Sequence, residues 1–153
     1  MEQSLPLNNN LKIFLADDDA DDREMFSDAL TESGIRCKLK TFINGCELLH
    51  FLDKEDSELP DILFLDLNMP ILDGLATLRK LRQNVRCKNL CVAIYSTSGS
   101  IRDYENTFRE GANLYIQKPS NFFTLQKTLS TLLNLENISD KFRTVGKNFI
   151  YKQ

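Results

Sequence analysis

The sequence of 153 residues has a single histidine, no tryptophan and no apolar run near the roughly 20 residues of a membrane span. Its four cysteines form no C-x-x-C pair and lie far from the histidine in sequence, so a zinc site is not expected. Lys and Arg number 19 against 22 Asp and Glu, a formal charge of −3, which argues against DNA binding. The composition therefore predicts a cytoplasmic protein with reduced thiols that binds neither DNA nor membranes.

Four short apolar runs each end at a polar residue, and such runs are typical of buried parallel strands. The runs and the residues that follow them are 13–16 before Asp17, Asp18 and Asp19; 62–65 before Asp66; 92–95 before Ser96; and 114–117 before Lys118. A fifth strand-like segment spans residues 37–42. Because ligands bind at the carboxyl ends of parallel strands, the polar residues are expected to meet at one edge of one sheet.

Helical patterns alternate with these five segments. The first ends at Gly34, and the second begins with Asn44 and Glu47 in the spacing of a capping box; a later one is expected to begin at Ser120. The predicted fold is α/β: a (βα)5 doubly wound parallel sheet in the order 2-1-3-4-5, flavodoxin-like, with its crevice between the first and third strands.

Three regions are expected along the chain. Residues 1–9 form a flexible N-terminus, residues 10–136 form the domain, and residues 137–153 form a basic and aromatic tail. Four basic residues and one acidic residue give this tail a formal charge of +3. It can pack on the domain, pair two chains as a homodimer or bind a partner, and the sequence does not choose among these.

The strand-end residues form a candidate site for a cation and a phosphate. Three carboxylates about 5 Å apart repel by roughly 3 kcal/mol per pair at an effective dielectric near 20, so they favour a bound cation. Oxygen ligands and a phosphate partner suit Mg²⁺. Asp17 and Asp18 are the expected ligands, and Asp66 stands opposite as a candidate nucleophile. The alternative for Asp17 and Asp18 is helix capping, which is all that is expected of Asp19, Asp21 and Asp22.

Over roughly residues 10–136 the chain resembles the receiver domain of two-component response regulators, of the stand-alone type. The ordered set of motifs carries the resemblance: residues 14–18 (FLADD), 65–70 (LDLNMP) with Asp73-Gly74, Ser96-Thr97, and 115–119 (YIQKP). Asp66 precedes Ser96 by 30 residues, and Ser96 precedes Lys118 by 22, as in that family. Ser96 stands where threonine is commoner, and Thr97 where alanine or glycine is frequent, which would narrow access to Asp66.

The resemblance implies a role for each site residue. Asp66 would accept the phosphoryl group, Asp18 would bind Mg²⁺ directly, and Asp17 would bind it largely through water. Asp66 also contributes to the metal site, and Asn68 would offer its backbone carbonyl. Lys118 would neutralise the phosphoryl group.

The resemblance also implies a switch. Ser96 would hydrogen-bond the phosphoryl group, and Tyr115 would turn inward as Ser96 moves. The Lys118–Pro119 peptide bond would be cis.

Partners follow from the same resemblance. The phosphodonor would be a histidine kinase or a phosphotransfer protein, and an unknown downstream protein would bind the fourth helix, fifth strand and fifth helix. Tyr104 and Phe108 of that fourth helix are interpreted as core rather than as docking residues. Catalysis would be limited to the protein's own phosphorylation and dephosphorylation.

Two other functions are considered. A Mg²⁺-dependent phosphatase of the haloacid dehalogenase kind also uses a strand-end aspartate, but it requires a second aspartate where this chain has Asn68, and usually a cap domain. A flavodoxin-like nucleotide binder would need a glycine-rich phosphate loop, and none follows the first strand.

Overall fold

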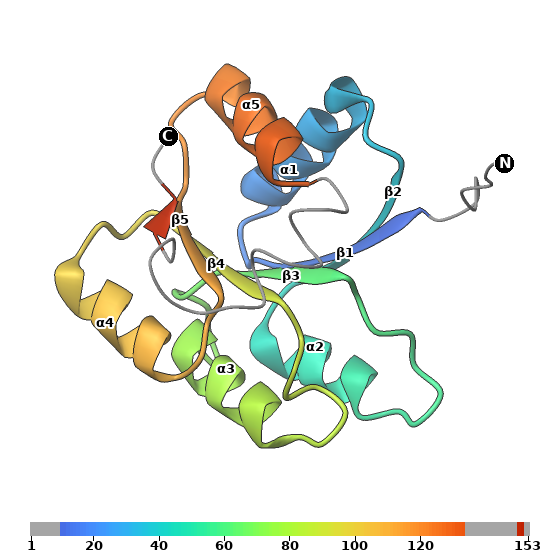
Figure 1. The fold of residues 1–153 in the computed structure, drawn as a ribbon, viewed down its shortest axis with the longest axis vertical. Coiled ribbons are helices and arrows are strands. Elements are labelled where there is room, and N and C mark those ends of the chain that lie inside the picture. The colour runs from blue at the N-terminus through green and yellow to red at the C-terminus, as the bar shows by residue number, and fades with distance from the viewer. Residues whose placement is uncertain (1–9, 134–149, 152–153) are drawn as a thin grey trace, which may run out of the picture.

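Six parallel strands form one sheet in the computed structural model, which describes residues 10–133 and 150–151 (Figure 1). The strand order is β2-β1-β3-β4-β5-β6. The strands are β1 (Leu11–Ala16), β2 (Cys37–Phe42), β3 (Ile62–Leu65), β4 (Val92–Ser96), β5 (Leu114–Gln117) and β6 (Ile150–Tyr151). The helices are α1 (Ala20–Ser33), α2 (Gly45–Leu52), α3 (Gly74–Gln83), α4 (Ile101–Arg109) and α5 (Phe122–Leu132).

The predicted doubly wound fold and the order 2-1-3-4-5 are confirmed, and β6 extends the sheet beyond β5. This sixth strand comes from the region expected to be a tail. The expected flexible N-terminus (residues 1–9) and residues 137–149 of that tail lie outside the described residues.

Helices cover both faces of the sheet. Figure 1 shows α1 and α5 on one face and α2, α3 and α4 on the other. Each face buries its own apolar cluster, with Phe26 and Phe64 in the first and Leu48 and Leu78 in the second. Every residue of the central strand β3 is buried, which explains its uninterrupted apolar sequence. Among the described residues, no helix is both long and apolar enough to span a membrane.

A capping side chain begins every helix. Each cap accepts a hydrogen bond from the amide three residues later, which satisfies one of the free donors of the first turn. The caps are Asp19, Asn44, Asp73, Ser100 and Asn121. Glu47 also accepts from the Ile43 amide at 3.0 Å, so the predicted capping box forms with its second bond displaced by one residue. The last helix begins after Asn121 rather than at Ser120, because Asn121 provides the cap.

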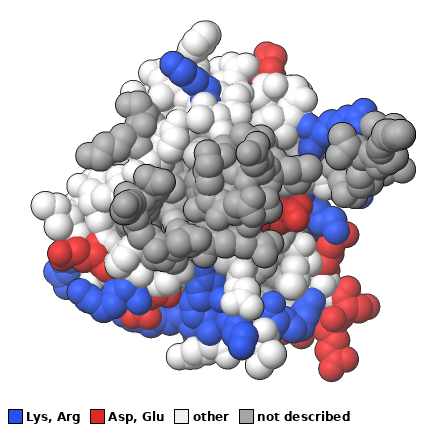
Figure 2. Space-filling model, viewed as in Figure 1, with Lys and Arg blue, Asp and Glu red and all other residues white. Residues whose placement is uncertain are grey.

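Two arginines connect the loops at the amino end of the sheet. Arg82 donates from Nε and Nη2 to the Gly111 carbonyl at 3.1 and 2.7 Å, and from Nη1 to the Leu90 carbonyl at 2.9 Å. Arg86 donates from Nη1 to the carbonyls of Leu52 and Lys54, both at 2.8 Å. Figure 2 shows basic side chains, with acidic ones among them, along the layer of α2, α3 and α4. The guanidinium groups thus tie the loops before β3, β4 and β5 to one another.

Candidate functional site

The neighbouring strands β1 and β3 are each followed directly by a buried aspartate. The Asp17 amide donates to the Phe42 carbonyl, and the Asp66 amide donates to the Ala16 carbonyl, each at 3.0 Å. These bonds continue the sheet past β1 and β3 and fix both backbones. The Asp17 residue is 0% exposed and the Asp66 residue is 4% exposed. Two adjacent strands are therefore followed by carboxyl groups that are buried from solvent.

Asp18 completes a group of three carboxylates. One oxygen of each of Asp17, Asp18 and Asp66 lies within 4.8 Å of the others, while the Asp18 residue remains exposed. The structure therefore brings together the three side chains that the sequence predicts as metal ligands.

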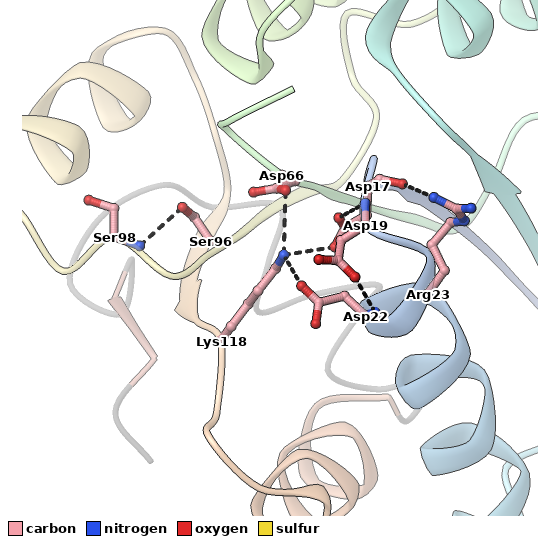
Figure 3. A network of polar contacts seen from close by, with 8 residues as sticks. All are labelled: Asp17, Asp19, Asp22, Arg23, Asp66, Ser96, Ser98 and Lys118. Carbon is pink, nitrogen blue, oxygen red and sulfur yellow. Dashed lines mark hydrogen bonds and ion pairs between the residues drawn. The ribbon is translucent and has the colours of Figure 1, made fainter. Parts of the chain in front are cut away.

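Lys118 reaches into this group from the end of β5. Its Nζ lies 2.8 Å from Asp17 Oδ2, 2.8 Å from Asp22 Oδ2 and 3.4 Å from Asp66 Oδ2 (Figure 3). Burial alone would lower the pKa of the ammonium, but the hydrogen bonds with Asp17 and Asp22 and the nearby carboxylates outweigh it and raise the pKa. Lys118 is therefore a fixed positive charge facing Asp66.

Asp66 is held in an unfavourable charge state. Burial raises the pKa of its carboxyl from 3.8 to about 6; Lys118 and the Asn68 amide act in the opposite direction, and Asp17 adds to the rise. A single ammonium does not balance the surrounding carboxylates, so the ionised site retains excess negative charge. Such a site gains stability from an added cation.

The donor set fits a hard divalent ion. All candidate ligand atoms are carboxylate oxygens, the type that Mg²⁺ prefers. Asp17 Oδ2 is buried, and the ammonium of Lys118, 2.8 Å away, is its one partner among the described residues. Asn68 lies beside Asp66 through its amide, and the role of its carbonyl stays a prediction.

Glycine at position 74 allows the loop after β3 to approach the site. A Cβ there would lie 2.1 Å from the Asp66 carbonyl oxygen and 2.7 Å from Leu67 Cα. The Gly74 amide donates to the Leu67 carbonyl at 2.8 Å. The Asp73-Gly74 motif therefore packs the start of α3 directly against the backbone of Asp66.

The same loop contains a strained residue. Ile71 has φ of +72°, a conformation that costs a β-branched residue free energy, and it is 81% exposed. It is the only non-glycine residue with positive φ in the described part of the chain. The sequence gives no sign of this strain, because isoleucine is a poor choice for such a turn.

Ser96 and Tyr115 meet through Ser98. The Ser98 amide donates to Ser96 Oγ at 3.2 Å, and the Tyr115 hydroxyl donates to the Ser98 carbonyl at 2.8 Å. Ser96 and Tyr115 are both fully buried, and the Tyr115 ring packs edge-on against Tyr104 at 4.6 Å between centroids. The two predicted switch residues are therefore connected, and the tyrosine is already turned inward.

A family comparison agrees with this geometry. Residues 13–130 match the family model of the response regulator receiver domain. The chain belongs to this family. The matched residues include the ends of β1, β3, β4 and β5, where the structure places Asp17, Asp66, Ser96 and Lys118.

Receiver domains of several kinds are similar to this one. The "Hybrid signal transduction histidine kinase D" of Dictyostelium discoideum is 31% identical over 131 residues, which cover 83% of this chain and 8% of the kinase. The crystal structure of the phosphorylated cyanobacterial phytochrome response regulator RcpA has a TM-score of 0.74 and 28% identity, covering 80% of this chain and 91% of that chain. The Mn²⁺-bound form of response regulator Rcp1 has a TM-score of 0.72 and 27% identity, covering 89% and 97%. The chain spans less than a quarter of the first curated relatives it matches.

Two sequence-based predictions about this receiver domain require correction. No peptide bond in the described residues is cis, so the expected cis Lys118–Pro119 bond is wrong for this structure. The trans form is intrinsically favoured even before proline, and here the Lys118 amide still donates to the Ser96 carbonyl at 2.7 Å. Asp22 was expected only to cap α1, yet it binds Lys118. Asp22 lies in the first turn of α1, and nothing in the sequence indicates that this turn faces the end of β5.

The sequence assigns two aromatic residues of α4 to the core, and the structure confirms one of these assignments. Tyr104 is half-buried against the core, as predicted, but the prediction that Phe108 is a core residue is wrong, because it is 44% exposed. Phe108 lies in the last turn of α4, beyond the part of the helix that Tyr104 anchors to β5.

Proposed function

We propose that this receiver domain is phosphorylated on Asp66 and changes its binding to a partner protein in response. The observation that carries the proposal is the buried Asp66 carboxyl, which faces Lys118 at 3.4 Å within a group of three carboxylates. An Oδ atom of Asp66 forms a bond to phosphorus as the bond from phosphorus to the donor group breaks. A histidine kinase or a phosphotransfer protein supplies the phosphoryl group.

Asp17, Asp18 and Asp66 would hold Mg²⁺, with the Asn68 carbonyl as a further ligand. When bound, the ion offsets negative charge on the carboxylates and on the incoming phosphoryl oxygens. Rcp1 supports this proposal, since one of its solved structures is a Mn²⁺-bound form. Lys118 stays opposite Asp66 and neutralises charge on the phosphoryl group, and Asp17 and Asp22 keep its ammonium in place.

Ser96 would connect phosphorylation to the output surface. Its hydroxyl is buried beside the site and accepts a hydrogen bond from the Ser98 amide. Binding of the hydroxyl to a phosphoryl oxygen would favour one arrangement of this loop and of Tyr115. The downstream protein would bind near α4, β5 and α5. We further propose that the protein works in the cytoplasm and catalyses only its own phosphorylation and dephosphorylation.

Labelling with acetyl phosphate tests the proposal without a protein donor. With Mg²⁺, intact-mass measurement is expected to show one added phosphoryl group, and peptide mapping is expected to place it on Asp66. Asp66→Asn is expected to abolish the label. Asp28→Asn, which changes an exposed aspartate of α1, should be labelled like the wild type.

Two results would contradict the assignment. Full labelling of Asp66→Asn would place the acceptor elsewhere, and full labelling after removal of divalent ions would contradict the metal requirement. Rapid turnover of small phosphate esters would instead favour the phosphatase alternative.

A further inference from the structure

The outer edge of β5 is apolar and is covered by β6. Leu114, Tyr115 and Ile116 carry no charge and are buried with β6 in place, so this edge differs from a charged, solvated edge strand. β6 lies parallel to β5 and pairs Ile150 with Tyr115 and Tyr151 with Ile116 (Figure 1). A segment more than 30 residues away in sequence thus pairs with the side of β5 that faces away from β4.

The two side chains of β6 join both layers of the fold. Ile150 packs against the cluster under α2 and α3, which includes Tyr115, and Tyr151 packs against the cluster under α1 and α5. Both are half-buried. Because successive side chains of a strand point to opposite faces of the sheet, Ile150 and Tyr151 extend the apolar cluster on each face beyond β5.

A series of contacts leads from β6 to the phosphoacceptor site. Ile150 is paired with Tyr115, whose hydroxyl donates to the Ser98 carbonyl, and the Ser98 amide donates to Ser96 Oγ. Lys118 follows β5 directly, and its amide donates to the Ser96 carbonyl. Tyr115 is inward in this arrangement, with β6 beside it and the Tyr104 ring against it.

We propose that the β5 edge is a strand-binding surface that this chain fills with its own residues 150–151. A partner would bind there through an extended segment that carries an aliphatic residue followed by an aromatic one, and it would displace β6. Binding by strand addition is a common mode of peptide recognition. β6 has two residues, whereas a strand usually has five or six, so a partner's strand can readily replace it.

Phosphorylation would control this exchange, a step that rests on the proposed function. The inward position of Tyr115 accompanies β6 docking in the structure, and it is the position expected when Ser96 binds a phosphoryl group. A phosphoryl group therefore strengthens β6 docking, and the unphosphorylated protein releases the β5 edge more readily. By linkage, β6 must favour the phosphorylated arrangement to the same extent.

Hydrogen exchange on the full chain tests whether β6 occupies the edge. Ile150→Asp places a charge in the half-buried position of β6, and Val85→Asp adds the same charge at an 83% exposed position as a control. Amides of residues 114–117 are expected to exchange at least tenfold faster in Ile150→Asp, and at the wild-type rate in Val85→Asp. Unchanged exchange in Ile150→Asp would overturn the proposal.

A peptide with the sequence of residues 148–153 (NFIYKQ) tests whether the edge accepts a strand from another molecule. Its affinity, measured by fluorescence anisotropy, is expected to be at least tenfold higher for Ile150→Asp than for the wild type. A peptide with aspartate in place of its isoleucine should bind neither. Equal affinities of the NFIYKQ peptide for the two proteins would overturn the proposal. Conversion of a wild-type dimer to a monomer by Ile150→Asp would also overturn it, by showing that β6 is exchanged between chains.

Beryllofluoride with Mg²⁺ tests the link to phosphorylation. It is expected to slow exchange of residues 114–117 and to weaken binding of the NFIYKQ peptide to the wild type by at least threefold, with no effect on Asp66→Asn. Binding of beryllofluoride, seen by ¹⁹F NMR, without either change would overturn the link while leaving the phosphoacceptor assignment intact. Absence of the ¹⁹F signal would instead contradict that assignment, and the two experiments above would still decide whether β6 occupies the edge.

Discussion

The two ends of the sheet each contain a half-buried basic residue with opposite kinds of partner. At the amino end, Arg82 donates to neutral acceptors, mainly the backbone carbonyls of Leu90 and Gly111. At the carboxyl end, Lys118 contacts the carboxylates of Asp17, Asp22 and Asp66. The first arrangement joins loops without introducing further charge, whereas the second surrounds one cation with more negative charge than it balances.

This difference separates a structural contact from a reactive one. The carbonyls around Arg82 are fixed dipoles that no ligand needs to change. Burial and the nearby Asp17 disfavour the ionised form of Asp66, and a metal ion or a phosphoryl group alters that balance. Substitutions at the amino end should therefore lower stability, while some at the carboxyl end should raise it and remove function.

The largest effect is expected at the amino end. Arg82→Lys keeps the charge but loses the planar fork that contacts several carbonyls, so the free energy of unfolding should fall by about 2 kcal/mol. Arg79→Lys is the control, because Arg79 forms a surface ion pair with Glu110 and should change stability by less than about 0.5 kcal/mol. Urea denaturation measures both. Equal losses would remove the distinction between the two arginines.

Neutralising Asp66, the proposed phosphoacceptor, should stabilise the metal-free protein. Its raised pKa means that ionised Asp66 disfavours folding, so Asp66→Asn should add about 2 kcal/mol at pH 8. The destabilisation by Asp66 is fully present above about pH 6, decreases as the pH falls through that value, and disappears below about pH 4, where the carboxyl is protonated in both folded and unfolded states. Urea denaturation at pH 8, 6 and 4 measures the trend. A stability difference that grows toward low pH would reverse the assigned direction of the shift.

Magnesium should stabilise the wild type by a smaller amount. At about ten times its dissociation constant, a ligand specific for the folded state adds about 1.4 kcal/mol. Thermal denaturation with and without MgCl₂ should show this increase in the wild type and in Asp28→Asn, and a much smaller one in Asp17→Asn. An equal increase in Asp17→Asn would place the ion elsewhere.

The smallest effect is expected from relief of backbone strain. Ile71→Gly should raise stability by up to about 1 kcal/mol, since glycine adopts positive φ freely and the isoleucine side chain is exposed. Val85→Gly changes another exposed β-branched residue, one without positive φ, and should lower stability. Chemical denaturation of the two variants measures the contrast, and a loss in both would show that position 71 is not strained.

Much of the fold could be predicted because its signals are local. Buried parallel strands need continuous apolar residues, and the chain then changes to polar residues at Asp17, Asp66 and Ser96 where each strand ends. Helix starts were readable from capping side chains such as Asn44. The meeting of Asp17, Asp18 and Asp66 followed from strand order, because adjacent parallel strands end at the same edge.

Features that depend on long-range packing were not predicted. Ile150 and Tyr151 have strand-forming side chains, but their pairing with β5 depends on an edge that only the folded sheet provides. The contact of Asp22 with Lys118 depends on how α1 approaches β5. Arg82 resembles any basic residue of a last helical turn, and its acceptors lie up to 31 residues away in sequence.

The direction of β6 affects how the protein should be handled. Because β6 runs parallel to β5, its chain leads toward the carboxyl end of the sheet, where Lys118 lies. β1 begins at the opposite, amino end of the sheet (Figure 1). An affinity tag or fluorescent protein joined shortly after Tyr151 is therefore expected to crowd the approach of the proposed phosphodonor. Fusions for interaction studies belong at the other terminus.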